Sequence, residues 1–354
     1  MITRILSNNR GVAILVTIAV ITILITITLE LNRKSRSVIA STAAIRDQYT
    51  LSHMTSSGIN AAIALLIKDK LESETDSIQE DWANPDKIAF LLEDIPFEDG
   101  EIKLKISDEL GNIQVNALVA YPDGIEFNES QKNLWDRFLR LIIFERELPE
   151  KIDPFCIINS VKDWLDSDDS ITGLSGAESE YYQDIETPYS CRNAPLSNLN
   201  QLAMIKGVTP DIFYNYNGMP GISEYMTVYG MKNSGSTYTY EGKININTAE
   251  ADVIAALLPD DSQHLASAIC EYRQEKSDLK YLHDLSDNTW YINVPGCENI
   301  EIDSNLIATS SDFFRILSVA KLREMEIATT AIVQRIKDNE SGKWKCKILS
   351  WQTE

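Results

Sequence analysis

Residues 8–34 read NNRGVAILVTIAVITILITITLELNRK, and this stretch decides how the rest of the chain is organised. Charged side chains bound an apolar run from Val12 to Leu29, which holds 18 residues and no formal charge. At about 1.5 Å per residue, a helix of this length nearly crosses the hydrocarbon core of a bilayer. The sequence therefore predicts one transmembrane helix, which we assign to residues 12–33.

A secretory signal peptide explains this run less well than a retained helix does. The apolar core of such a peptide is about 7–15 residues long and ends at a small-x-small cleavage site. Here the run is longer and is followed by Glu30, Arg33 and Lys34 without such a site. Threonines within the run are compatible with a helix, because their hydroxyls can bond the carbonyl three or four residues back. They are Thr17, Thr22, Thr26 and Thr28.

Composition limits what the remaining chain can do. The protein has 354 residues and a net charge of −21, and no second long apolar run follows residue 34. A surface this acidic repels nucleic acid and suits divalent cations or basic partners. No two cysteines are spaced as CxxC, so the sequence gives little support for a zinc site or a thioredoxin-like redox site. If the body is exported, one or two disulfides are plausible, in a pairing that the sequence leaves open, among Cys156, Cys191, Cys270, Cys297 and Cys346.

Helical periodicity continues beyond the apolar run to about residue 70, with Gly58 as the only expected weak point. Residues 72–87 are polar and acidic and are expected to form a loop. From residue 100 the period changes to two, which predicts a strand over 102–106. A turn at residues 109–112 then leads to a second strand over 113–115, so we expect a hairpin here.

The middle of the chain is predicted to be helical and the end to be strands. Apolar side chains recur at helical spacing in 129–144 and 155–165, and short helical hairpins are expected over 194–214 and 244–274. In the second hairpin, Thr248 is the expected N-cap and Pro259 the expected end of the first helix. Segments 313–336 and 343–351 alternate and are expected to close an antiparallel sheet. The fold class is therefore α+β with a helical insertion.

The junction before the apolar run resembles a known processing signal. RGVAILVTIAVITIL, residues 10–24, on a helix that continues into an α+β domain, resembles the class III signal of the type IV pilin and pseudopilin superfamily. The resemblance implies that a prepilin peptidase cleaves between Gly11 and Val12, that Val12 is N-methylated, and that the helix is kept. Most superfamily members carry glutamate at the fifth mature position, where this chain has Val16.

The missing glutamate and four further segments make the chain similar to one family in particular. DELGNIQVNAL (108–118), DWLDSDDSITGLSGAESEYY (163–182), APLSNLNQLAMIKGVTPDIF (194–213) and GKININTAEADVIAAL (242–257) look like the general secretion pathway protein K family, in that family's order. That family is the minor pseudopilin K of type II secretion systems. It implies a pilin-like fold with a large inserted helical domain of two sterile-alpha-motif-like parts.

The resemblance also implies a domain plan, a location and partners. The plan is a class III leader over 1–11, a transmembrane helix over 12–33, pilin-like segments over 34–118 and 309–354, and an inserted helical part over 119–308. The location is the bacterial inner membrane, with one span and a periplasmic body. The implied partners are the minor pseudopilins I and J at the pseudopilus tip, the major pseudopilin, the inner-membrane platform of the secretion system and the prepilin peptidase.

The segment 163–182 carries the densest chemistry in the chain. Six carboxylates fall within 18 residues, and calcium prefers six to eight oxygen ligands on a flexible loop. The segment is not an EF-hand, because Ile171 replaces the glycine of the sixth position and Glu178 lies one place beyond the twelfth. By itself it reads as a solvated acidic loop, and the resemblance implies a structural calcium site instead. The expected ligands are Asp166, Asp168 and Glu178, followed by Asp163, Asp169 and Glu180.

Other chemistries find little support in the sequence. The helical hairpin over 244–274 is similar to a DNA-binding hairpin, but its turn is Pro259-Asp260-Asp261, with carboxylates where a phosphate would sit. We therefore expect no nucleic-acid binding. The histidines at 53, 264 and 283 form no metal spacing, and we expect no enzymatic activity. Two alternatives to a minor pseudopilin are a minor pilin of a type IV pilus and a single-pass periplasmic sensor or DNA receptor.

Overall fold

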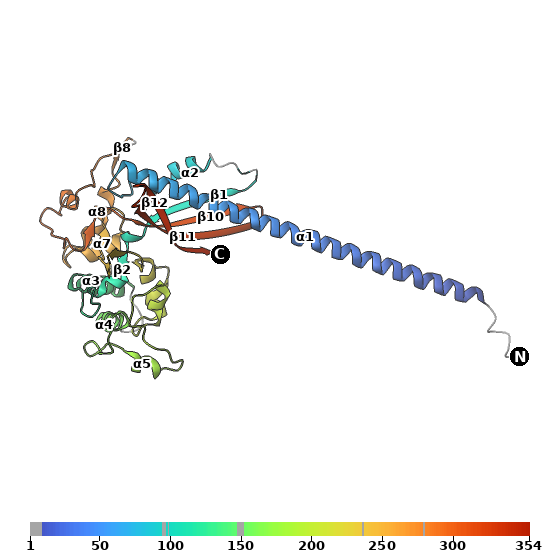
Figure 1. The fold of residues 1–354 in the computed structure, drawn as a ribbon, viewed down its shortest axis with the longest axis horizontal. Coiled ribbons are helices and arrows are strands. Elements are labelled where there is room, and N and C mark those ends of the chain that lie inside the picture. Colours follow the sequence, from blue (N-terminus) through green and yellow to red (C-terminus); the bar gives the residue numbers. More distant parts are fainter. Residues whose placement is uncertain (1–8, 94–96, 98, 147–151, 236, 279) are drawn as a thin grey trace.

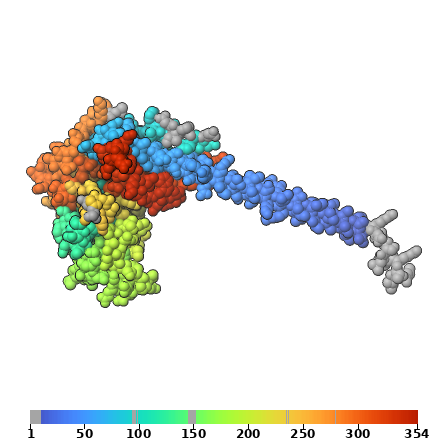
Figure 2. Space-filling view, in the orientation of Figure 1, coloured from blue at the N-terminus to red at the C-terminus, as the bar shows by residue number. Residues whose placement is uncertain are grey.

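The computed structural model describes residues 9–93, 97, 99–146, 152–235, 237–278 and 280–354. Its longest element is helix α1 (Asn9–Glu72), whose first half projects from the body as an isolated rod (Figure 1, Figure 2). The most apolar window of this helix has a mean hydropathy of 2.9, and none of it is buried within the protein. Thr17, Thr22, Thr26 and Thr28 each donate to the carbonyl four residues back, as expected. The chain is therefore consistent with a single-pass membrane protein.

The second half of α1 lies on a four-stranded sheet. Buried side chains of the helix, including Ile59, Ala62 and Leu66, pack with apolar residues of the sheet. The helix runs through Gly58 without a break, so the expectation that the helix is weakened at Gly58 is wrong. A Cβ at Gly58 would lie 2.5 Å from the Ser318 hydroxyl oxygen. Glycine is therefore present because helix and sheet approach closely there, and the packing offsets its low helix propensity.

The sheet is antiparallel, in the order β1-β10-β11-β12. Its strands are β1 (Glu101–Asp108), β10 (Phe313–Leu322), β11 (Met325–Lys337) and β12 (Trp344–Thr353). The closing strands are thus as expected, but the early hairpin is wrong. Asp108 accepts from the Leu110 N–H at 2.8 Å and turns the chain away after β1. The next strand, β2 (Ile113–Gln114), pairs in parallel with β3 (Met226–Thr227) instead.

The chain between β1 and β10 forms a helical region at the end of the molecule opposite the N-terminus (Figure 1). One buried cluster of apolar side chains runs through this region and includes Ile113, Trp135, Trp164 and Trp290. Its α-helices are α3 (Glu129–Arg146), α4 (Pro154–Leu165), α5 (Ser179–Gln183), α6 (Pro210–Phe213), α7 (Ala251–Leu257) and α8 (Ala266–Tyr272). Its remaining short strands are β4 (Met231–Ser234), β5 (Thr237–Tyr240), β6 (Ile244–Asn245), β7 (Lys276–Ser277), β8 (Lys280–Tyr281) and β9 (Ile307–Ala308).

Short 3₁₀ turns complete the described structure. They are η1 (Asp81–Ala83), η2 (Glu109–Gly111), η3 (Val115–Leu118), η4 (Leu199–Met204), η5 (Ile222–Glu224), η6 (Gln263–Leu265) and η7 (Trp290–Asn293). The segment expected to be a loop over 72–87 ends inside a helix, because Pro85 begins α2 (Pro85–Glu93). Proline suits a first helical position, where its missing N–H leaves no bond unmade.

Two further local expectations differ from the structure. Thr248 does not cap α7, whose N-cap is Glu250. The Thr248 hydroxyl instead donates to Asp108 at 2.8 Å. The Thr248 side chain thus bonds to a residue distant in sequence, where the local sequence predicted a helix cap. The five cysteines are all free thiols, so the disulfides allowed by export are not formed here.

Candidate metal centre in the acidic loop

Three of the six expected carboxylates meet where α4 passes into the acidic loop. Ligand atoms of Asp163, Asp166 and Glu178 all lie within 4.8 Å of one another, and all three residues are buried. Asp163 lies in the last turn of α4, Asp166 caps its C-terminus, and Glu178 precedes α5. The chain thus leaves one helix, makes a loop, and returns beside the end of that helix before the next one begins.

Asp163 holds the loop in this shape. Its carboxylate accepts from the Thr172 N–H at 3.0 Å and from the Ala177 N–H at 2.7 Å. Gly176 makes the close approach possible, because a Cβ there would lie 2.1 Å from Asp163 Oδ2. Asp163 therefore organises the backbone around the group.

Asp166 and Glu178 provide the oxygens that have no other partner. Within the described residues, Asp166 Oδ1 and both carboxylate oxygens of Glu178 are buried without a hydrogen bond. Glu178 stands at the N-cap of α5 but does not cap it with its side chain. Buried carboxylate oxygens without partners are costly, and a bound cation satisfies them.

Lys162 supplies one positive charge to the group. Its ammonium donates to Asp166 Oδ2 at 2.6 Å and to the Thr172 hydroxyl at 3.1 Å. Three carboxylates and one ammonium leave a deficit of two charges, which matches a divalent cation. Lys162 was not among the residues predicted from the sequence, although its position four residues before Asp166 on a helix places the two side chains side by side.

Burial, followed by repulsion between the carboxylates, raises the pKa values of the group. Burial, followed by the charges of Asp163 and Asp166, raises the pKa of Glu178 to about 8. Burial also raises the pKa of Asp166 to about 6, although Lys162 opposes the shift. A proton on Glu178 therefore partly compensates the deficit when no cation is bound, and a cation has to displace that proton.

The other expected ligands lie outside this group. Asp168 accepts from the Ser170 N–H at 2.7 Å, and Asn193 donates to the Asp168 carbonyl oxygen at 2.7 Å. Asp169 and Glu180 are exposed. Asp168 and Asp169 are still close enough for their charges to raise the pKa of Glu178. Hard oxygen donors, low exposure and the charge deficit fit a calcium ion held by Asp163, Asp166 and Glu178.

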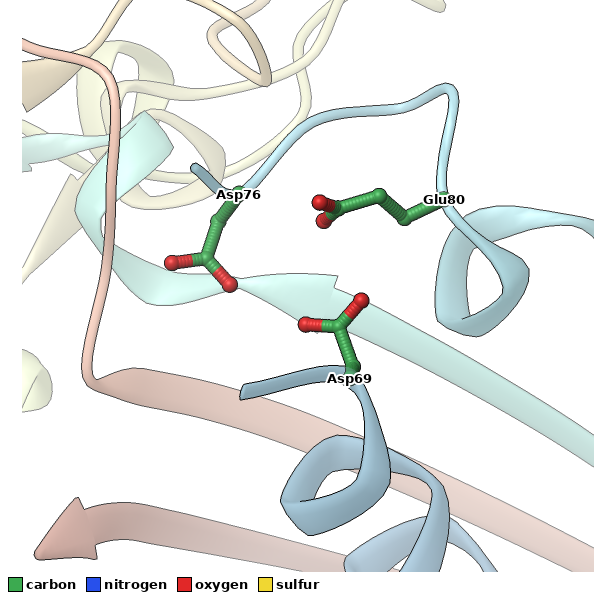
Figure 3. A group of neighbouring side chains, drawn as sticks. All are labelled: Asp69, Asp76 and Glu80. Atoms are coloured by element: carbon green, nitrogen blue, oxygen red, sulfur yellow. The ribbon is translucent and has the colours of Figure 1, made fainter. Parts of the chain in front are cut away.

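A second group of carboxylates, Asp69, Asp76 and Glu80, is already paired with a positive side chain of the protein. Figure 3 shows their carboxyl groups turned toward a common space between the end of α1 and the loop that follows it. Arg335 of β11 donates to Asp69 at 3.1 Å and also to Asp76 and to the Ser311 carbonyl oxygen. Glu80 accepts from the Trp82 indole N–H at 2.8 Å.

This second group joins α1, the sheet and the helical region. The Asp76 carboxylate accepts from the Ser311 N–H at 2.9 Å, and its carbonyl accepts from Asn245 at 2.9 Å. Asn245 also donates to Asp108 at 2.8 Å. The group is therefore a structural junction. No local pattern indicates it, because the partners Arg335, Ser311 and Asn245 lie far from the three carboxylates along the chain.

Comparison with known proteins connects the fold and the acidic loop to one family. Residues 111–219, which contain the acidic loop, match the family model described as type II secretion system (T2SS), protein K. Type II secretion system protein K of Pseudomonas aeruginosa is 22% identical over 349 residues, which cover 94% of this chain and 91% of that protein. The protein K of Pectobacterium carotovorum is 26% identical over 58% of this chain and 61% of that protein. The chain is therefore similar to the type II secretion system protein K family, with the family model matching residues 111–219.

Coverage differs among relatives in the protein K family. The match to the Aeromonas hydrophila protein K, at 23% identity, covers 42% of this chain and 44% of that protein. A chain of the crystal structure of the GspK-GspI-GspJ complex from enterotoxigenic Escherichia coli matches with a TM-score of 0.60 at 16% identity. That match covers 88% of this chain and 99% of the other. It confirms the α+β fold.

Proposed function

We propose that this protein is a minor pseudopilin that occupies the tip of a type II secretion pseudopilus, where it initiates assembly and limits growth. The observation that carries the proposal is the bulk of the helical region, which widens the molecule at the end opposite the N-terminus of α1 (Figure 2). In a filament of parallel helices, a further subunit beyond this one would have to occupy that space. The geometry therefore suits an end position better than a repeated one.

The membrane-spanning part of α1 supports the same position. No carboxylate lies between Val12 and Leu29, and Val16 stands where the superfamily usually has glutamate. A carboxylate buried in lipid is costly unless it is paired, and the terminal amine of a neighbouring subunit can pair with it. A subunit without this carboxylate has no need of that partner, which suits the last position in a filament.

The proposed assembly has a defined set of partners. Minor pseudopilins I and J bind this protein at the tip, and the major pseudopilin continues the filament below them. The inner-membrane platform of the secretion system drives assembly, and the helical region lies in the periplasm. The protein acts by binding, without catalysis, and the acidic loop carries a structural calcium ion.

Stoichiometry and position test the tip assignment. Sheared pseudopili are expected to carry about one copy of this protein per filament, and antibody label against the helical region is expected at one end only. Quantitative mass spectrometry against the major pseudopilin and immunogold electron microscopy provide the two readings. Label along the shaft, in the ratio of a major subunit, would show that the tip assignment is wrong.

Processing at the leader gives a separate prediction. Mass spectrometry of the membrane-extracted protein is expected to find methylated Val12 as its first residue. Gly11→Glu is expected to leave the leader attached and to stop secretion, because the peptidase requires the small residue before the cleaved bond. Arg10→Lys keeps the charge and serves as the control. A secretion-competent protein that still begins with Met1 would contradict this prediction.

A further inference from the structure

Lys162 brings a positive charge into direct contact with the candidate calcium ligands. Its side chain is only 10% exposed, and its ammonium donates to Asp166 Oδ2 at 2.6 Å. Within the part of the chain that the structure describes, the other oxygen of that carboxylate, Oδ1, is buried without a hydrogen bond. A metal ion that binds Oδ1 therefore shares one carboxylate with the ammonium, so the two positive charges meet at close range.

The same ammonium also holds the acidic loop in shape. It donates to the Thr172 hydroxyl at 3.1 Å, and the Thr172 N–H donates to Asp163 at 3.0 Å. Lys162 thus connects the C-terminal end of α4, where Asp166 is the cap, to a residue further along the loop. A positive charge in the last turn of a helix is also favoured by the helix dipole. These contacts support the loop through groups of the protein alone.

A second lysine beside the loop, Lys206, provides a comparison. Its ammonium donates to the Gly176 carbonyl oxygen at 3.1 Å and lies over the Tyr181 ring, 4.8 Å from the centroid. Both of these partners are uncharged, whereas Lys162 pairs directly with a carboxylate of the group. Lys206 therefore supports the backbone of the loop without occupying an oxygen that a metal ion would use.

Repulsion between the Lys162 ammonium and a bound ion weakens the binding of that ion. A divalent ion and an ammonium about 5 Å apart repel strongly enough, even at the dielectric constant of water, to reduce affinity by about tenfold. The effect is larger at a buried position, because the local dielectric constant is lower there. A trivalent ion is repelled more strongly still, in proportion to its charge. Lys162 therefore affects both the affinity of the site and its preference for ion charge.

We propose that Lys162 is a resident counter-ion of the acidic loop, which keeps the loop folded when no metal is bound and limits the affinity and the charge of the ion that binds. The proposal rests on the structural calcium ion of the proposed function and adds how that site is regulated. A loop held in shape by its own lysine stays folded when calcium is scarce. It also releases calcium more readily than the three carboxylates alone would.

Calcium titration of the full-length protein in detergent tests the proposal. Lys162→Met removes the charge but keeps an unbranched side chain, and it is expected to lower the Kd for calcium by about tenfold or more. Lys206→Met makes the same change beside the loop and is expected to shift the Kd by less than about threefold. Isothermal titration calorimetry measures both, with Glu178→Gln as the background for calcium bound elsewhere on the acidic surface.

Two further measurements separate the charge of Lys162 from its support of the loop. Lys162→Met is expected to raise the affinity for terbium several-fold more than that for calcium, because terbium is trivalent. Terbium luminescence excited through tryptophan, with calcium as competitor, measures this ratio. In chelator, Lys162→Met is expected to unfold at a lower temperature than the wild type, because Asp166 loses its partner. Lys162→Gln can still donate a hydrogen bond and is expected to lower the Kd similarly with a smaller loss of midpoint.

The remaining outcomes each decide against part of the proposal. An unchanged or higher Kd in Lys162→Met and Lys162→Gln, with calcium still bound, would overturn the role of Lys162 and leave the calcium site standing. Equal changes in Lys162→Met and Lys206→Met would also overturn it, because contact with Asp166 would then not set the affinity. If neither the wild type nor any variant binds calcium above the Glu178→Gln background, the structural calcium ion of the proposed function fails as well.

Discussion

Arg335→Ala is expected to lower the free energy of unfolding by about 3–5 kcal/mol, because it leaves buried carboxylates without their cation. The Arg335 side chain is fully buried and binds Asp69, Asp76 and the Ser311 carbonyl oxygen. Its guanidinium also lies over the Phe314 ring, 4.6 Å from the centroid, and Phe314 packs edge-to-face on Trp82. Tryptophan fluorescence during denaturant unfolding of the full chain in detergent, compared between wild type and variant, measures this loss.

Arg323→Ala is the matched control for this prediction. Arg323 pairs with Asp47 at 2.8 Å, but its side chain is 59% exposed. Exposed ion pairs contribute about 1 kcal/mol or less, so the control is expected to change stability little. Equal and small losses in both variants would contradict the role assigned to Arg335.

The same junction makes stability depend on pH. Burial, followed by the charges of Glu80 and Asp76, raises the pKa of Asp69 to about 7. Because this pKa lies above that of an unfolded aspartate, the stabilising contribution of the proton is present at low pH and is lost as pH rises through about 7. Asp69→Asn is expected to flatten the wild-type profile between pH 6 and 8.

Calcium is expected to raise the midpoint of thermal unfolding, and adding a chelator is expected to remove that increase. Binding to the folded state alone stabilises by about 2.7 kcal/mol when calcium is 100-fold above its Kd. Glu178→Gln is expected to remove this gain. Of the three buried carboxylate oxygens in the group that lack a hydrogen-bond partner, two belong to Glu178. Asp166→Asn is expected to act in the same direction, and thermal unfolding with and without calcium measures both.

Glu186→Gln makes the same chemical change at an exposed position of the same loop region and controls for the lost charge. In chelator, Glu178→Gln is expected to leave the midpoint unchanged or to raise it, since it relieves repulsion from Asp163 and Asp166. A wild-type midpoint that calcium does not move would mean that the loop is only a solvated acidic stretch.

The raised pKa of Glu178, about 8, gives this prediction a pH signature. Without calcium, the proton on Glu178 is lost as pH rises through about 8, and the stability that it provides is lost with it. With calcium bound, the ion takes the place of that proton. The shift in midpoint caused by calcium is therefore expected to grow from pH 6 to pH 8, with protons released on binding.

The sequence predicted those elements whose cause is local. The uncharged run of 12–29 and the helical period beyond it predicted α1, and strict alternation predicted β10 and β11. The hairpin of 102–115 was wrong because β1 pairs with β10, about 200 residues further on, and no local pattern encodes that distance. Thr248 was wrong for a similar reason, since its hydroxyl bonds to Asp108 rather than to its own helix.

In the candidate site, too, local sequence predicted some residues and missed those that depend on packing. Carboxylate density pointed to the acidic loop, and Asp166 and Glu178 were among the first choices. Asp168 was also a first choice but lies outside the group, while Asp163 lies in it as the residue that shapes the loop. The difference depends on the path of the loop backbone, which brings Glu178 back beside Asp163 and Asp166, and composition does not specify that path. Lys162 and Arg335 became visible only with the packing.

The adjacency of β1 and β10 also determines the order in which the protein can fold. During synthesis β1 emerges early, but its sheet partner β10 follows only after the whole helical region. Closing a flexible segment of about 200 residues costs about 2.7 kcal/mol more chain entropy than closing one of about 10 residues. Prior folding of the helical region removes this cost, because β9 pairs with β6 and Asn245 of β6 donates to Asp108 at the end of β1. Until then the face of α1 that will cover the sheet is exposed, so the newly made chain passes through an interval in which it is open to aggregation and proteolysis.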